Sequence, residues 1–70
     1  MRTEESRETL VIIRVEEVCR RTGVSRSTIY RMMERGEFPK AHSVSSGTVG
    51  WNAAEVSRWI AAKLGLPDPS

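Results

Sequence analysis

Basic and hydroxyl side chains gather between residues 25 and 35 of this 70-residue chain, and they are the groups best suited to bind another molecule. An arginine can donate two hydrogen bonds to a guanine, a serine can donate to a phosphate or a base, and a tyrosine can contact a phosphate or pack on a sugar. We therefore expect this segment to contact double-stranded DNA. The side chains concerned are Ser25, Arg26, Ser27, Thr28, Tyr30, Arg31 and Arg35.

The formal net charge of +2 is weak support for this expectation, but the charge is unevenly distributed. Residues 14–40 contain seven basic and four acidic side chains, whereas residues 1–13 have a net charge of −1 and residues 41–70 are balanced. By itself, such a basic stretch more often indicates a solvated helical surface than a nucleic-acid interface. The elements that position these side chains must therefore decide between the two interpretations.

The chain has few reactive or metal-binding side chains. With Cys19 as its one cysteine and His42 as its one histidine, it can form no internal disulfide and no structural zinc site. These two residues and scattered carboxylates do not assemble a nucleophile with its base, and no phosphate-binding loop is present. We expect no enzyme, no metal and no cofactor. The polar N-terminus differs from a signal peptide and no apolar run could cross a membrane, so we expect a cytoplasmic protein.

The periodicity before the basic segment predicts a short helix and a tight turn. Apolar residues between Val15 and Thr22 fall on one arc at about 100° per residue. Cys19 is the small residue expected where a second helix crosses the first. Gly23 can adopt the positive φ of a helix end, Val24 can fill the space beneath the turn, and Ser25 can cap the following helix.

The second helix is expected to span Arg26–Arg35, to end at Gly36 and to dock on the first, because ten residues with three apolar positions are not stable alone. A purely structural pair of helices would explain the apolar positions but not the basic outer face. That face lies on the helix whose N-terminal half enters the major groove in a helix-turn-helix, so we favour DNA binding. The apolar positions are Ile29, Met32 and Met33.

The remainder of the chain predicts a hairpin and a third helix. Phe38-Pro39 indicates an extended exit, and residues 42–51 can form two short strands around a Ser/Gly turn. Asn52 can cap the third helix, with Glu55 placed to complete a capping box. The expected apolar face of that helix consists of Ala53, Val56, Trp59, Ile60 and Leu64.

The expected fold class is mainly α with a small β-hairpin, in the order helix, turn, helix, hairpin, helix: a winged helix-turn-helix. We expect a flexible tail over residues 1–9, one domain over residues 10–64 and a second flexible tail over residues 65–70. The apolar run Leu10–Ile13 could be a strand or an entry segment, and its length does not decide which.

Several other side chains favour structural roles. The aromatic residues and methionines are large groups that a thin core needs, and Cys19 is expected to be a buried small residue. Arg20 and Arg21 end the first helix, where a phosphate contact and a role in complementing the helix dipole are equally well supported. We expect Arg58 and Lys63 on a solvated face. The expected core groups are Met32, Met33, Phe38, Trp51 and Trp59.

The chain resembles the AlpA family of prophage regulators. The residues that carry the resemblance are the run 24–31, then Gly36 to Lys40, then Val49-Gly50-Trp51, and finally residues 55–60. The resemblance covers residues 10 to about 64 and implies a MerR-like winged helix-turn-helix shared with phage excisionases. It implies a transcriptional regulator, or an excisionase that uses the same surface, with a hairpin wing that approaches the DNA backbone.

The wing departs from that pattern, because Ser43 and Gly47 stand where relatives usually have lysine and arginine. Phosphate contacts would then come from hydroxyl groups, backbone N–H groups and two nearby cationic side chains. A different class of function, an adaptor for an integrase or a polymerase subunit, would make Arg26 and Arg31 dispensable. We expect a monomer in solution that assembles cooperatively on DNA. The wing candidates are Lys40, His42, Ser45, Ser46 and Thr48.

Overall fold

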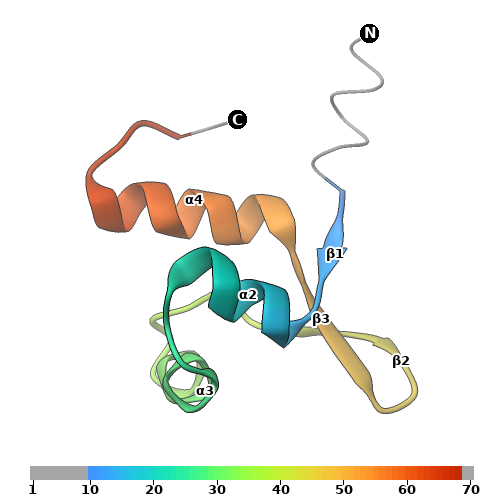
Figure 1. Ribbon diagram of the computed structural model, residues 1–70. Coiled ribbons are helices and arrows are strands. Elements are labelled where there is room, and N and C mark those ends of the chain that lie inside the picture. The colour runs from blue at the N-terminus through green and yellow to red at the C-terminus, as the bar shows by residue number, and fades with distance from the viewer. Residues whose placement is uncertain (1–9, 69–70) are drawn as a thin grey trace, which may run out of the picture.

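The computed structural model describes residues 10–68, which form three helices and a small antiparallel sheet (Figure 1). The expected tail over residues 1–9 lies outside the described residues, as do the last two residues of the chain. The winged helix-turn-helix architecture, mainly α with a β wing, is confirmed. In chain order the elements are β1 (Ile12–Ile13), α2 (Val15–Thr22), α3 (Arg26–Glu34), β2 (His42–Ser45), β3 (Thr48–Asn52) and α4 (Ala53–Leu64).

The sheet has three strands in the order β1-β3-β2, so the expected two-stranded wing is part of a larger sheet. The hairpin β2–β3 turns at residues 46–47, and β1 pairs with the other edge of β3. Ile13 lies opposite Trp51 and Ile12 lies opposite Asn52. Since successive side chains point to opposite faces, Ile13 and Trp51 share the face that the helices cover, and Ile12 points away from them.

The core lies where the three helices meet the inner face of the sheet. Each helix contributes one fully buried side chain: Val18 from α2, Ile29 from α3 and Val56 from α4. Trp51 is also fully buried, which confirms the expectation that it is a core residue, and Phe38 is 5% exposed. Met32, Met33 and Trp59 pack against this core as partly buried groups.

Two details of the expected core are wrong. Cys19 is only partly buried, because the inner face of α2 centres on Val15 and Val18 and Cys19 lies at its margin. Leu64 is 65% exposed, whereas Ala61 is buried. The last turn of α4 extends past the other helices (Figure 1), so the leucine at its end has nothing to pack against.

Two indole N–H groups anchor the segment that joins α3 to β2. The Nε1–H of Trp51 donates to the Pro39 carbonyl at 2.9 Å, and the Nε1–H of Trp59 donates to the Glu37 carbonyl at 2.8 Å. The Phe38 ring lies between the indoles, 4.8 Å from the Trp59 centroid and 6.5 Å from that of Trp51. The segment leading from the helix-turn-helix to the wing is therefore held by aromatic packing and by hydrogen bonds to its backbone.

Asn52 begins α4 as expected, since its side-chain oxygen accepts a hydrogen bond from the Ala54 N–H at 2.8 Å. The Glu55 carboxylate, which we expected to complete a capping box, lies instead 3.5 Å from His42 Nε2. This contact links the base of the wing to α4. No helix within residues 10–68 has the length and apolar character needed to cross a bilayer.

Candidate nucleic-acid interface

The turn between α2 and α3 is fixed by three local hydrogen bonds. Gly23 has φ +74°, and its N–H donates to the Cys19 carbonyl at 2.8 Å. The Thr22 hydroxyl donates to the Val18 carbonyl at 2.8 Å and accepts from the Val24 N–H at 3.2 Å. From the sequence we expected Thr22 only at the end of the inner arc of this helix, and its role in the turn was not predicted. A threonine directly before a helix-ending glycine is the signal that could have indicated it.

The start of α3 is stabilised by side chains that we had assigned to DNA contact. The Ser25 Oγ accepts a hydrogen bond from the Thr28 N–H at 3.4 Å and lies 2.9 Å from the Thr28 hydroxyl. The Thr28 oxygen also accepts from Arg31 Nη2 at 3.2 Å. Ser25 therefore caps the helix as expected, and Thr28 connects this cap to the Arg31 guanidinium.

The outer face of α3 presents arginine side chains to solvent. Arg26, Ser27 and Arg31 are exposed, whereas Ile29 between them is fully buried. Arg35 is also exposed, but it follows the helix as its C-cap, because α3 ends at Glu34, one residue earlier than expected. None of these arginines forms an ion pair within residues 10–68.

Tyr30 does not lie fully on the outer arc where we expected it. Its ring is half-buried, with its centroid 6.2 Å from that of Trp51 and the two planes inclined by 59°. It lines a shallow hollow together with Met33, Glu34 and Lys40. Tyr30 follows the fully buried Ile29, and its ring is large enough to reach back from there to the core.

The wing candidates separate into two places. Ser45, Ser46 and Thr48 lie at the tip of the hairpin, where Ser45 and Ser46 are exposed and Thr48 is half-buried. Lys40 and His42 lie at its base, and His42 faces Glu55 on α4. The structure thus brings the three hydroxyl residues together but leaves the two cationic candidates at the other end of β2.

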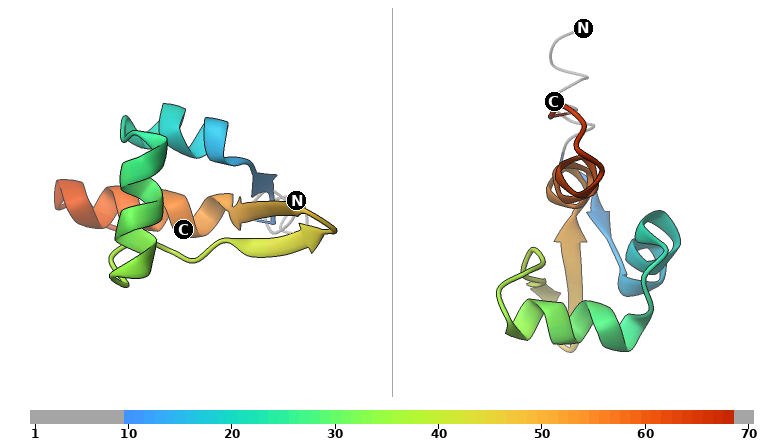
Figure 2. Two further views of the ribbon diagram at one scale, coloured as in Figure 1. Left: turned by 90° about the horizontal axis from the view of Figure 1, so that it is seen from below. Right: turned by 90° about the vertical axis from the view of Figure 1, so that its left-hand side faces the viewer.

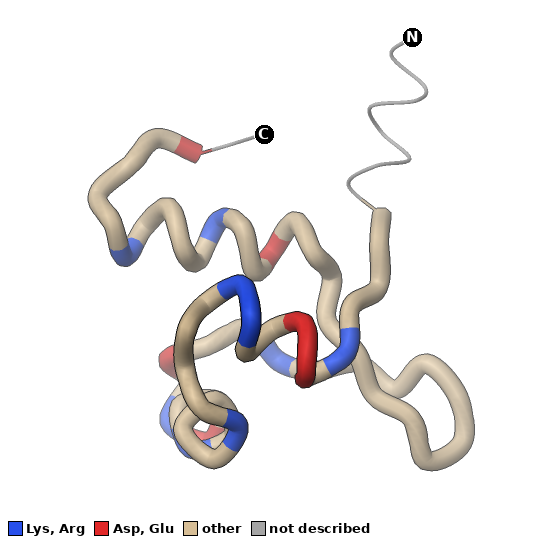
Figure 3. The backbone as a smooth tube through the Cα atoms, viewed as in Figure 1, with Lys and Arg blue, Asp and Glu red and all other residues tan. Residues whose placement is uncertain are grey.

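The two arginines at the end of α2 are engaged by one carboxylate. Arg20 donates to Glu17 Oε1 at 2.9 Å, and Arg21 donates to Glu17 Oε2 at 2.8 Å. Hydrogen bonds from Arg20, which has the larger effect, and from Arg21 lower the pKa of Glu17 to about 2. The cluster of Glu17, Arg20 and Arg21 has a net charge of +1, whereas its two arginines alone would have +2. Figure 3 shows its acidic and basic positions on α2 and further basic positions on α3.

Residues 10–68 contain nine basic and six acidic side chains. With two of the basic groups held by Glu17, the exposed arginines of the helix-turn-helix that form no ion pair within residues 10–68 are Arg14 at the start of α2 and those of α3 and its C-cap. This is the arrangement expected of a surface that contacts a polyanion.

Comparison with known proteins points in the same direction. A family model described as prophage CP4-57 regulatory protein (AlpA) matches residues 11–64. Over 52 residues the chain is 42% identical to the uncharacterized protein ORF88 of Enterobacteria phage P4. That match covers 74% of this chain and 59% of the phage protein, so the chain spans less than two thirds of that relative.

A second relative is the DNA-binding transcriptional activator AlpA of Escherichia coli (strain K12), which is 30% identical over 67 residues. This match covers 87% of the chain and 96% of the relative. No solved structure matches the chain significantly.

Proposed function

The chain belongs to the AlpA family of prophage regulatory proteins, and from this premise we propose that it binds specific sites on double-stranded DNA to regulate transcription. The observation that supports this proposal best is the outer face of α3. It combines exposed arginines that form no ion pair within the described residues with a helix start fixed by Ser25 and Thr28 and with an inner side anchored by Ile29.

In this proposal α3 enters the major groove by its N-terminal half, as recognition helices do. Arg26, Ser27 and Arg31 contact base edges. Ser25 and Thr28 contact a phosphate near the helix start or orient their neighbours. The Tyr30 hydroxyl and Arg35 contact the sugar–phosphate backbone. We propose residues 10–64 as the DNA-binding domain, with residues 1–9 and 65–70 as flanking segments.

The wing approaches the backbone beside the major groove. Its tip offers the hydroxyl groups of Ser45, Ser46 and Thr48, and these suit phosphate contacts that are weaker than those of lysine or arginine. Lys40 provides one cationic contact at the base of the wing. His42 is the least suited of the candidates, because it already faces Glu55.

Three arginine variants test the proposal. A preferred site is first selected from random duplexes, and Arg26→Ala, Arg31→Ala and Arg58→Ala are then titrated against that site and a scrambled duplex at one salt concentration. Arg58 is an exposed residue of α4, so it controls for the loss of one charge. If Arg26 or Arg31 pairs with a guanine, its loss costs about 1–3 kcal/mol on the selected site and relaxes the preference at one base pair.

Equal losses from all three variants on both duplexes would contradict recognition by α3 and leave a weakly basic surface. A salt titration of the unsubstituted protein gives a second check. Four to six phosphate contacts predict a log–log slope of roughly −4 to −5, and an affinity that does not change with salt would contradict the proposal.

A further inference from the structure

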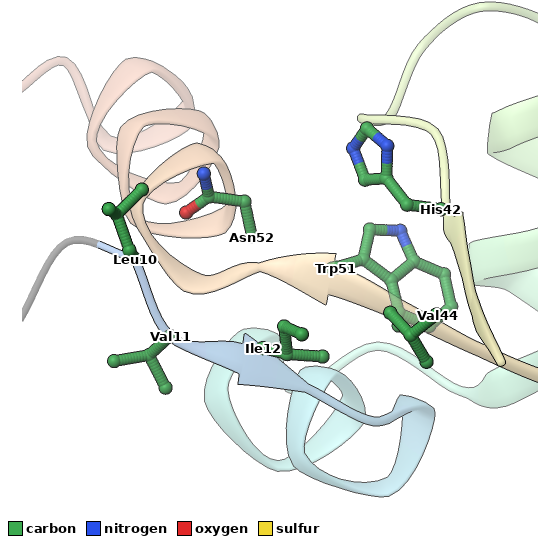
Figure 4. Close-up of a pocket in the computed structure, with 8 residues that line it drawn as sticks. Leu10, Val11, Ile12, His42, Val44, Trp51 and Asn52 are labelled. Carbon is green, nitrogen blue, oxygen red and sulfur yellow. The ribbon is translucent and has the colours of Figure 1, made fainter.

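Within residues 10–68 no helix covers one face of the sheet, and that face carries several exposed apolar side chains. The helices pack against the side that bears Ile13 and Trp51, and Figure 2 shows them on one side of the sheet, whereas the opposite side carries apolar groups from the β1 segment and β2. Leu10 is 74% exposed, Ile12 is 60% exposed and Val44 is 39% exposed. Together with Gly50 of β3 they line an open groove of about 300 Å³, shown in Figure 4, which we call the sheet groove.

The sheet groove is poorly suited to a small molecule. Its volume is at the lower end of the range for such sites, and they usually enclose most of the ligand. Its two polar side chains have contacts outside the groove, because His42 Nε2 lies 3.5 Å from Glu55 Oε1 and the Asn52 oxygen accepts from the Ala54 N–H. An open groove that is lined mainly by apolar side chains indicates contact with another protein surface.

A second exposed apolar group lies at the C-terminal end of α4. Leu64 and Leu66, which we call the leucine pair, are 65% and 57% exposed. The Leu66 N–H donates to the Ala61 carbonyl at 2.8 Å and the Gly65 N–H donates to the Ala62 carbonyl at 3.2 Å, with Gly65 at φ +72°. These bonds form a Schellman motif, so the leucine pair is held in a defined position while its side chains contact solvent.

The sheet groove and the leucine pair lie at opposite ends of the molecule. The end of α4 and the sheet are at opposite sides of Figure 1, and the right view of Figure 2 looks along α4 from its C-terminal end with the sheet behind. In the left view of Figure 2, α3 runs across the direction of α4 at a point between these two ends. Both surfaces therefore stay accessible when the outer face of α3 contacts DNA.

We propose that the leucine pair of one copy docks in the sheet groove of the next copy when both bind neighbouring sites on one duplex. The inference rests on the proposed DNA binding. A contact between two different surfaces repeats head to tail and forms an open chain, which a linear duplex can accommodate. The two longer dimensions of the molecule, 38 and 35 Å, are close to one turn of B-DNA, about 34–36 Å.

The size of the two surfaces explains why a second copy would dock only on DNA. A few exposed side chains on each side cannot approach the roughly 800 Å² per partner that stable complexes bury. Two copies on one duplex are held at a high effective concentration, so a weak contact becomes measurable there. The contact therefore increases the cooperativity of binding and leaves the free protein monomeric.

The experiment uses duplexes with one or two copies of the selected site, the two copies set 8 to 14 base pairs apart. Leu66→Ser alters the leucine pair and Ile12→Thr alters the sheet groove, while Ala62→Gln changes an exposed neighbour of the pair as a control. Val44→Thr is a second groove variant should Ile12→Thr lower the melting temperature. For the unsubstituted protein we expect a cooperativity factor within the roughly 5- to 150-fold range of coupled sites at one spacing.

Leu66→Ser and Ile12→Thr are each expected to bind the single site within about twofold of the unsubstituted protein and to lose cooperativity. An equal mixture of the two regains part of it, because the intact leucine pair of one variant meets the intact groove of the other. Independent binding by the unsubstituted protein, or cooperativity kept by both variants, would overturn the inference. A mixture that regains nothing would overturn the head-to-tail arrangement. Failure to bind the single site would instead overturn the proposed function, and the inference with it.

Discussion

Replacing Glu17 by glutamine should increase the affinity for DNA. The Glu17 carboxylate accepts hydrogen bonds from both Arg20 and Arg21. Glutamine has nearly the same shape but no charge, so the substitution frees two guanidinium groups. The first helix of a helix-turn-helix crosses the DNA backbone, and the freed groups lie at the end of that helix. We expect the affinity to increase for specific and scrambled duplexes alike, since phosphate contacts contain no sequence information.

The magnitude follows from the charge of the cluster. Its net charge rises from +1 to +2, and one unit charge at 4 to 10 Å from a phosphate changes affinity by about two- to sixfold in water. If one freed arginine neutralises a phosphate, the log–log salt slope becomes steeper by about 0.9, and if both do so the change doubles. Binding at low salt should therefore improve more than binding at physiological salt.

The assay is a fluorescence anisotropy titration between 50 and 200 mM salt, with Glu16→Gln as the matched control. Glu16 is the preceding residue of α2 and loses the same charge, but its carboxylate makes no hydrogen bond or ion pair within residues 10–68. We expect Glu16→Gln to leave the salt slope unchanged. Identical affinities and slopes for the two variants would refute the reasoning that Glu17 restrains the arginines.

The Glu17 carboxylate should also make the stability of the folded state depend on pH. The pKa of Glu17 is about 2 rather than 4.5, because Arg20 and Arg21 hydrogen-bond to its ionised form. Its ion pairs therefore stabilise the folded state fully above about pH 4.5, and this contribution is lost as the pH falls toward 2. Urea unfolding should show that the stability difference between the unsubstituted protein and Glu17→Gln narrows over this interval. A difference that stays constant would contradict the pKa.

Three further predictions concern stability. Ile29→Ala removes a fully buried side chain and should cost about 2–5 kcal/mol, so an unchanged melting temperature would mean that the faces of α3 are wrongly assigned. Trp59→Phe removes the indole N–H that donates to a backbone carbonyl after α3, which should cost about 0.5–1.5 kcal/mol by urea unfolding beyond any packing loss. Gly50→Ala places a Cβ 2.6 Å from the Ile12 Cγ2, so we expect the free energy of unfolding to fall by about 1–3 kcal/mol. Adding Ile12→Ala to this variant should restore part of the lost stability.

Much of the helix-turn-helix could be predicted from the sequence because its signals are local. Ser25 and Asn52 cap the helices that follow them, and Gly23 ends α2 with a positive φ. Each of these effects depends on hydrogen bonds or backbone angles within a few residues. The engagement of Arg21 by Glu17 is also local, at the spacing i, i+4, and was therefore predictable from the sequence.

The DNA-binding candidates were predictable only in part. The alternation of buried and exposed positions along α3 correctly placed Ile29 inside and the arginines outside. The position of Tyr30 was not predictable in this way, because its ring packs on Trp51, 21 positions later in the chain. The contact of His42 with Glu55 likewise joins two elements that are distant in the sequence, so it was not predictable from local patterns.

The sequence by itself therefore determined the helices, their caps and the hairpin, whereas the tertiary structure decided what those elements cover. The run Leu10–Ile13 was ambiguous, since four apolar residues suit a strand or an entry segment equally. Its last two residues, Ile12 and Ile13, form β1 because β3 offers them an edge, with Ile13 opposite Trp51. The same pairing leaves Ile12 on the uncovered face. Local patterns specify hydrogen bonds between near neighbours, but pairing and burial between distant segments depend on how the whole chain packs.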